Sequence, residues 1–132
     1  MLFLRTTSPE FLTVQLKSIV IFTSSYQRLY PFLMFVHTVL FWLKHPEHRE
    51  DLEALRTGLE SLKSVEEISV VYIGTPAPTR RPVIDHSYDV SITLIFTDQS
   101  AHDSYQIHPV HRVFVDSCSH LWERVQIYDA VS

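Results

Sequence analysis

Residues 34–132 are predicted to form an α+β fold of the ferredoxin-like, split βαβ sandwich type. Three observations predict it. Hydrophobic residues alternate with a period of two in four segments, helix signals mark three segments between them, and the order is strand, helix, strand, strand, two helices, strand. In such a fold the helices cover one face of the sheet and leave the other face open.

The first three elements are marked by their periodicity and by the residues that end them. Residues 35–44 alternate as a strand with two largely apolar faces, and His45-Pro46 ends it. Leucines at positions 52, 55, 59 and 62 form one stripe of a helix expected over residues 47–63. Residues 67–74 are rich in Ile and Val and form the second expected strand, which ends at Gly74.

The second half begins with an expected loop, because residues 75–86 hold three prolines. A third strand is expected over residues 87–96, with a buried face formed by Tyr88, Val90, Ile92, Leu94 and Phe96. Thr97 is the expected N-cap of a short helix that reaches about residue 107. Pro109 suits the first turn of another helix to about residue 120, and residues 124–131 form the last expected strand.

The uncovered face of this sheet predicts a second copy of the chain. It combines apolar side chains with small hydroxyl side chains, namely Val36, Leu40, Trp42 and Ile95 with Ser91 and Thr93. Monomers seldom expose an apolar patch of that size to water. Packing two such faces across a twofold axis buries both at once, so we expect a homodimer formed through the open sheet face.

Composition restricts the partners of the chain. The net charge of −4 and the lack of a basic stripe argue against a nucleic-acid surface. No apolar run approaches the roughly eighteen residues that span a bilayer, so no membrane partner is expected. The single cysteine, Cys118, excludes an internal disulfide and a cysteine zinc cluster, and it fits the reducing cytoplasm, which is the expected location.

Residues 1–33 differ from the rest in composition, since they hold three basic residues and one acid among many Ser and Thr. We interpret them as an extension outside the domain. The preferred interpretation is that Met34 is the native start and that the first 33 residues are an over-extended reading of the gene. An organellar targeting segment and a genuine extension are the alternatives.

Three stretches resemble the stress-responsive A/B-barrel family, also called dimeric α/β-barrel proteins. The first is the opening strand FVHTVLFWLK at residues 35–44, and the second is SYDV at residues 87–90. The most specific is YQIHPVH at residues 105–111, which matches the family's Tyr-x-x-His-Pro-x-His. The resemblance covers about residues 35–130 and implies a dimeric α/β barrel.

This family includes the plant olivetolic acid cyclase, a polyketide cyclase, beside stress-response proteins with no assigned reaction. The resemblance implies a pocket between sheet and helices for a small aromatic or polyketide-like ligand, with no cofactor. It implies that His111 is the base, that Tyr105 supplies a hydroxyl and that His37 lies in the pocket. If the protein is catalytic, His111 would remove the proton while Tyr105 and His37 polarise the carbonyl group. The expected pocket lining further includes Tyr88, Val90, His108 and Phe114.

At one position the chain departs from the cyclase, because Val90 stands where that enzyme has a third-strand histidine. Retention of His37, Tyr105 and His111 favours cofactor-free acid–base chemistry next to a carbonyl group. The valine favours a non-enzymatic stress-response protein with a structural or partner-binding role. A cofactor-free monooxygenase is a weaker alternative, since it rests on analogy of fold.

Each candidate site residue also has a structural interpretation. His108 and His111 can cap the helix that follows them and bind loop carbonyls. His37 can be a hydrogen-bonded core residue, and Tyr105 can be a packing aromatic. A separate pair, His45 and His48, flanks an acid, but it lies in a turn and the sequence fixes no third ligand, so no metal site is expected.

Overall fold

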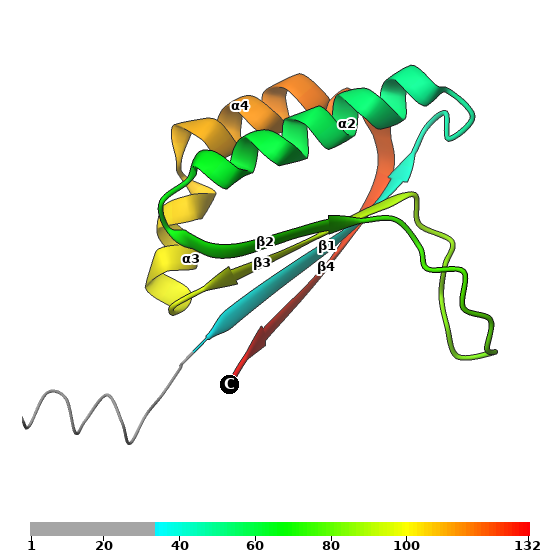
Figure 1. Ribbon diagram of the computed structural model, residues 1–132. Helices are drawn as coiled ribbons and strands as arrows, with labels where there is room; N and C mark the ends of the chain where they lie inside the picture. The colour runs from blue at the N-terminus through cyan, green and yellow to red at the C-terminus, as the bar shows by residue number, and fades with distance from the viewer. Residues whose placement is uncertain (1–33) are drawn as a thin grey trace, which may run out of the picture. The chain divides into compact units, whose positions relative to one another are not determined.

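Figure 1 shows the computed structural model, which describes residues 34–132. The expected extension in residues 1–33, together with the question of a start at Met34 or a targeting segment, lies outside the described residues. Four strands form one antiparallel sheet in the order β2-β3-β1-β4. They are β1 (Phe35–Leu43), β2 (Ile68–Gly74), β3 (Val90–Phe96) and β4 (Trp122–Val131).

The helices pack on one face of this sheet and leave the other face open (Figure 1). They are α2 (Arg49–Ser61), α3 (Gln99–Gln106) and α4 (Pro109–Cys118), with 3-10 turns η1 (Leu62–Ser64) after α2 and η2 (Ser119–Leu121) after α4. The order of the elements and their antiparallel pairing confirm the predicted α+β, ferredoxin-like split βαβ sandwich. None of the helices in residues 34–132 is long and apolar enough to cross a membrane.

The period-two pattern of the central strands β1 and β3 separates the two faces. Buried and partly exposed side chains alternate along both strands without a break. The buried set packs against the leucine stripe of α2, in which Leu55 and Leu59 are fully buried. The core therefore lies between the sheet and the helices. Each such side chain stabilises the fold by about 1.5–3 kcal/mol when it leaves water.

The third strand begins at Val90, later than its predicted start at residue 87. Asp89 explains the difference, because its N–H donates to the Phe41 carbonyl (2.9 Å) and its carboxylate accepts from the Leu43 N–H (2.8 Å). The preceding residue, Tyr88, packs edge-on against Trp42 of the open face, with ring centroids 6.4 Å apart. The expectation that Tyr88 continues the buried face of the strand is therefore wrong.

Several other boundaries differ from the prediction by one or two residues. The N-cap of α3 is Asp98 and not Thr97, because the Asp98 carboxylate accepts from the Ala101 N–H at 2.8 Å. The last strand begins at Trp122, two residues before its predicted start at 124. Pro109 occupies the first turn of α4, as predicted.

Helices α2 and α4 approach each other closely at Gly58. A Cβ atom on residue 58 would lie 2.5 Å from the Cys118 Sγ and 3.0 Å from the Phe114 ring. Neither contact is compatible with ordinary packing, so the missing side chain permits the helix crossing. Cys118 is buried there, and burial raises the pKa of its thiol.

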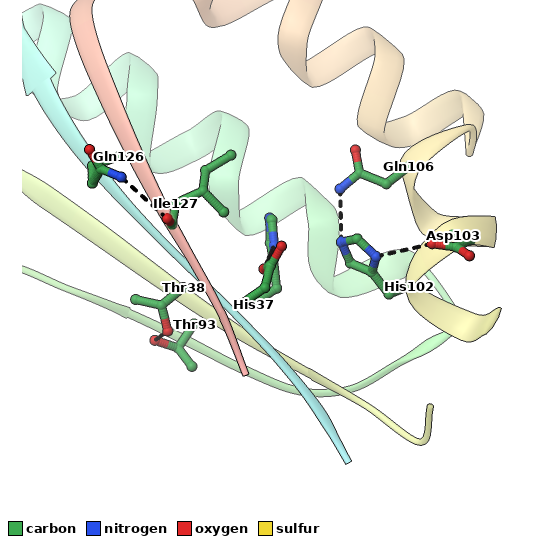
Figure 2. Close-up of polar contacts among 9 residues, drawn as sticks. His37, Thr38, Thr93, His102, Asp103, Gln106, Gln126 and Ile127 are labelled. Atoms are coloured by element: carbon green, nitrogen blue, oxygen red, sulfur yellow. Dashed lines mark hydrogen bonds and ion pairs between the residues drawn. The ribbon is translucent and has the colours of Figure 1, made fainter. Parts of the chain in front are cut away.

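The open face carries a mixed row of side chains across all four strands. At its centre the hydroxyls of Thr38 and Thr93 lie 3.1 Å apart (Figure 2). Tyr72 on β2 and Tyr128 on β4 continue the row at the two edges, and they are 64% and 60% exposed. Val36, Leu40 and Ile95 surround the threonine pair and are only partly buried. This face thus keeps the apolar character that predicted a partner.

Candidate functional site

A cavity of about 220 Å³ lies between the sheet and the helices. Its wall is mostly apolar and consists of Val39, Phe41, Leu59, Leu62, Ile92, Phe114, Val115, Trp122, Val125 and Ile127. Four polar side chains interrupt this wall, namely His37, Tyr105, Gln106 and His111. Because Val125 and Ile127 on β4 are 39% and 45% exposed, the cavity opens over this edge strand.

His37 lies on the helix-covered face of β1 and is 4% exposed. Register places Asp129 of β4 directly opposite, and the His37 Nδ1–H donates to the Asp129 Oδ1 at 2.6 Å. This bond leaves Nε2 as the nitrogen with a free lone pair when the ring is neutral. Burial lowers the pKa of His37 and outweighs the opposing effect of the Asp129 carboxylate, so the neutral ring is favoured.

Tyr105 and His111 form the second polar group of the wall, with ring centroids 4.5 Å apart. Helix α3 ends at Gln106, and the His111 Nδ1–H donates to the Gln106 carbonyl (3.1 Å), which fixes the ring across the turn between α3 and α4. Burial lowers the pKa of His111 and raises that of the Tyr105 hydroxyl. Within residues 34–132 the Tyr105 hydroxyl has no hydrogen-bond partner, so its proton is available to a ligand.

His102 is a buried histidine that is absent from the predicted site. It lies on α3, is 8% exposed and stacks on Phe35 with centroids 4.2 Å apart. The Gln106 amide donates to its Nε2 at 3.0 Å, and its Nδ1 lies 3.4 Å from the Asp103 carboxylate (Figure 2). One turn of α3 therefore holds this ring by both of its nitrogens.

These rings form a continuous series that begins at His102, outside the cavity wall, and continues along the wall through His37, Tyr105 and His111. The centroid distances are 4.9 Å from His102 to His37, 6.2 Å from His37 to Tyr105 and 4.5 Å from Tyr105 to His111. The three residues implied by the family motif are thus brought together from β1, α3 and α4. Their roles in chemistry stay predictions, because proximity alone does not show a reaction.

The other expected lining residues occupy different positions. Phe114 lines the cavity. Val90 is fully buried and His108 is partly buried, and neither is part of the cavity wall. His108 is instead the N-cap of α4, since its Nδ1 accepts from the Val110 N–H at 3.1 Å. Tyr88 lies against Trp42 on the open face, as described above.

The exposed histidine pair differs from the cavity group. His45 and His48 stack with centroids 4.9 Å apart, and each lies near the Glu47 carboxylate, at 3.8 and 3.6 Å. All three side chains are more than half exposed. Solvent screens such contacts, so this group has the properties of an ordinary helix start.

Three polar residues of the site were missed by sequence reasoning: Asp129, His102 and Gln106. Asp129 reaches His37 only through the register of β1 with β4. The spacing of His102 and Gln106 by one helical turn was a usable signal, because it places both on one face of the short helix. The cavity wall thus offers two histidines with free lone pairs, His37 and His111, and one hydroxyl donor, Tyr105, around an apolar space. This arrangement suits proton transfer to and from a small organic molecule.

The chain is similar in fold to several solved structures. A dabb family protein with a ferredoxin-like fold from Mesorhizobium loti is similar, with 28% identity, a TM-score of 0.63, and coverage of 75% of this chain and 96% of that one. A dimeric ferredoxin-like protein of unknown function from Thermobifida fusca has 16% identity, a TM-score of 0.64, and coverage of 78% and 94%. The hydroxynitrile lyase from Passiflora edulis has 13% identity, a TM-score of 0.64, and coverage of 75% and 93%. At their low identities the last two structures show a shared fold alone, and no curated protein matches the sequence.

The family assignment comes from the sequence itself. A family model described as the stress responsive A/B barrel domain matches residues 35–132. That span contains all four strands of the sheet, the helices that cover it and the YQIHPVH segment. The chain therefore belongs to the stress responsive A/B barrel domain family.

Proposed function

We propose that the protein is a homodimer whose pocket binds a small aromatic or polyketide-like carbonyl compound and moves a proton next to its carbonyl group. The observation that carries the proposal is the contact of Tyr105 with His111 at the wall of a mostly apolar cavity. A hydroxyl donor and a neutral base in one apolar site are the two groups that enolisation requires.

The size of the cavity supports a ligand of this class. An enclosed apolar cavity of about 150 Å³ accommodates benzene. The cavity here, at about 220 Å³, has room for a substituted ring, and its opening over β4 admits a longer chain. Apolar walls with a few convergent polar groups are typical of small-molecule sites.

In the proposed reaction His111 is the base. Its Nδ1–H is held by the Gln106 carbonyl, so the Nε2 lone pair is the one that accepts the α-proton. The Tyr105 O–H donates to the carbonyl oxygen as negative charge develops there. The lowered pKa of His111 keeps it unprotonated at neutral pH, which a base requires.

The role of His37 differs from the one that the family resemblance implied. Its Nδ1–H is engaged by Asp129, so a neutral His37 has no N–H left to polarise a carbonyl. Its Nε2 is an acceptor, suited to a ligand hydroxyl or to a second proton. Asp129 acts as a positioning residue, because it selects this tautomer.

The homodimer is supported by the open face and by similar structures. The Thermobifida fusca protein and one from Bacteroides fragilis are both described as dimeric. The partly buried apolar residues around Thr38 and Thr93 are the surface that a second copy would cover. Native mass spectrometry of the full chain is expected to give a mass of twice 15.4 kDa, and a monomer at micromolar concentration would contradict it.

The alternative is a non-enzymatic stress-response protein with a structural or partner-binding role. Val90, an apolar core residue where the related cyclase has a histidine, favours it. In this alternative His111 and His108 only connect and cap the helices, and the hydrogen bonds that they form are consistent with that. By contrast, the similar fold of a hydroxynitrile lyase is consistent with an enzyme and therefore with the first proposal.

The two functions are separated by hydrogen–deuterium exchange of phenylacetone in D₂O, followed by proton NMR. Wild-type protein is expected to accelerate loss of the α-proton signals. His111→Ala should lower the rate by about 10²- to 10⁴-fold, and Tyr105→Phe by about 10²-fold. His120→Ala, on the exposed turn after α4, is the matched control and should leave the rate unchanged.

Exchange that survives in folded His111→Ala would contradict the assignment of the base. Exchange no faster than in buffer, together with a ligand-free dimer by native mass spectrometry, would favour the non-enzymatic alternative.

A further inference from the structure

Three possible metal ligands come together beside the cavity, and one of them, His37, also lines it. They are His37 of β1, His102 of α3 and Asp129 of β4, and one ligand atom from each lies within 4.8 Å of the other two. Residues 37, 102 and 129 are far apart in the sequence, so their spacing does not predict that they form a group. In the sequence, only the exposed pair His45 and His48 has a spacing that suggests a metal site.

We propose that His37, His102 and Asp129 bind a divalent transition-metal cation such as Zn²⁺, Fe²⁺ or Co²⁺. Two imidazoles and one carboxylate form a ligand set that such ions favour, whereas Mg²⁺ and Ca²⁺ prefer oxygen ligands. The proposal goes beyond the proposed function, which assigns acid–base chemistry to Tyr105 and His111 and needs no ion.

The geometry of the group requires only small adjustments. Ligand atoms bound at about 2.1 Å to one ion lie roughly 3.0–3.5 Å from one another. His37 Nδ1 and Asp129 Oδ1 are now 2.6 Å apart, so they would separate slightly as the ion replaces the shared proton. The rings of His37 and His102 are already 4.9 Å apart by centroid.

The surroundings of His102 match those of a metal-binding histidine. Its Nδ1 lies 3.4 Å from the Asp103 carboxylate, the kind of outer contact that orients metal-bound imidazoles (Figure 2). Its Nε2 would then face the ion. The Gln106 amide now donates to that nitrogen at 3.0 Å, and rotation of the amide would present its oxygen as a fourth ligand.

Burial and access are both suitable. His37 and His102 are 4% and 8% exposed, so two ligands are withheld from water and held by packing against Phe35, Phe96 and Tyr105. The Asp129 side chain is 43% exposed on the edge strand and provides the route by which an ion enters. The exposed His45–Glu47–His48 group lacks this burial and serves as an internal comparison.

A cation at this position would be bound by His37, which lines the same cavity as the Tyr105–His111 pair. It would polarise a ligand carbonyl from the side of the pocket where neutral His37 cannot donate a hydrogen bond. Metal binding would therefore complement the proposed base without replacing it.

Cobalt binding tests the proposal directly. The full-length protein, treated with EDTA and then dialysed, is titrated with Co²⁺ by calorimetry and followed by visible absorption. We expect one Co²⁺ per chain, with absorption bands that report nitrogen and oxygen ligands. Two variants each remove one ligand: His102→Phe, and Asp129→Asn, which keeps an acceptor for His37 but removes the charge. Each should weaken Co²⁺ binding by about 100-fold or more, because even the loss of a residue that only supports a ligand costs about 10- to 100-fold in metal affinity.

Two control variants make the result specific. The double variant His45→Gln/His48→Gln should bind Co²⁺ as the wild type does, and so should His111→Ala, which removes the proposed base but no ligand. Circular dichroism establishes that each variant is folded. If His102→Phe does not fold, Asp129→Asn still tests the proposal, because it changes an exposed side chain. Absence of stoichiometric binding at about 100 μM Co²⁺, binding that persists in both ligand variants, or binding lost with His45 and His48 would each overturn the proposal.

Discussion

The two faces of the sheet are built from the same alternating strands but reach different degrees of burial. On the helix-covered face, Val90, Ile92, Leu94 and Phe96 of β3 are between 0% and 1% exposed. On the open face, the intervening side chains Ser91, Thr93 and Ile95 are all partly exposed. One face completes its packing within a single chain, and the other does not.

The two faces therefore place different requirements on the sequence. The closed face requires side chains of complementary shape, because helices must fit against it without voids, and the polar residues that line the cavity lie between it and the helices. The open face leaves apolar Val36, Leu40 and Ile95 partly exposed around the hydrogen-bonded Thr38–Thr93 pair, and this is the surface that the proposed second copy would cover. Changes on the open face should therefore affect assembly, and changes on the closed face should affect folding and the site.

The largest expected effect is on the open face. Val36→Asp places a carboxylate beside Ile95, its partner in the register of β1 with β3. Burying an unpaired charge in each of two symmetric copies should weaken the proposed dimer by about 4 kcal/mol, roughly a thousandfold in dissociation constant. Sedimentation equilibrium measures this change.

The matched control is Val83→Asp, on the loop between β2 and β3, where the side chain is 87% exposed. It should leave the oligomeric state unaltered. A Val36→Asp protein that stays dimeric with wild-type affinity would place the interface elsewhere.

The second effect is on the closed face, at the crossing of α2 and α4. Gly58→Ala introduces a methyl 2.5 Å from the Cys118 Sγ, and forced repacking should cost about 1–3 kcal/mol, partly offset by roughly 1 kcal/mol of improved helix propensity. Urea denaturation should show a lower unfolding free energy with an unchanged dimer.

Cys118→Ala removes the clashing sulfur and provides the cross-check. In the double variant the two substitutions should couple favourably, by about 0.5–3 kcal/mol relative to their separate effects. Simple additivity would mean that the helices do not meet at this point.

Much of the fold was accessible from the sequence because it depends on local periodicity. Alternation in residues 35–44 and the leucine stripe of residues 52–62 each report a single element and its buried side. The prediction failed at Tyr88, where a tertiary interaction decided the outcome: Asp89 binds the end of β1 and ends the alternation. A carboxylate that caps a neighbouring strand leaves no periodic signal.

The candidate site was predicted less completely, for a related reason. His37, Tyr105 and His111 were identified through resemblance to a family motif. The partner of His37, by contrast, is determined by the register between β1 and β4, which pairs residue 37 with residue 129. A shift of that register by one residue would turn Asp129 to the open face. Contacts of this kind need the three-dimensional structure.

The smallest expected effect is the pH dependence contributed by His111 on the closed face. Its pKa is lowered in the folded protein by burial, with the hydrogen bond to Gln106 opposing the change. Above about pH 6.5 the ring is neutral in both folded and unfolded chains and contributes nothing to the pH dependence. Below that pH the unfolded chain binds a proton that the folded one resists, so the unfolding free energy should fall as the solution is acidified. Urea denaturation of wild type and His111→Gln between pH 5 and 8, with EDTA present, measures this contribution. The variant should lose less stability on the acid side, and an equal or steeper decline would mean that His111 takes up its proton in the folded chain as readily as in the unfolded one.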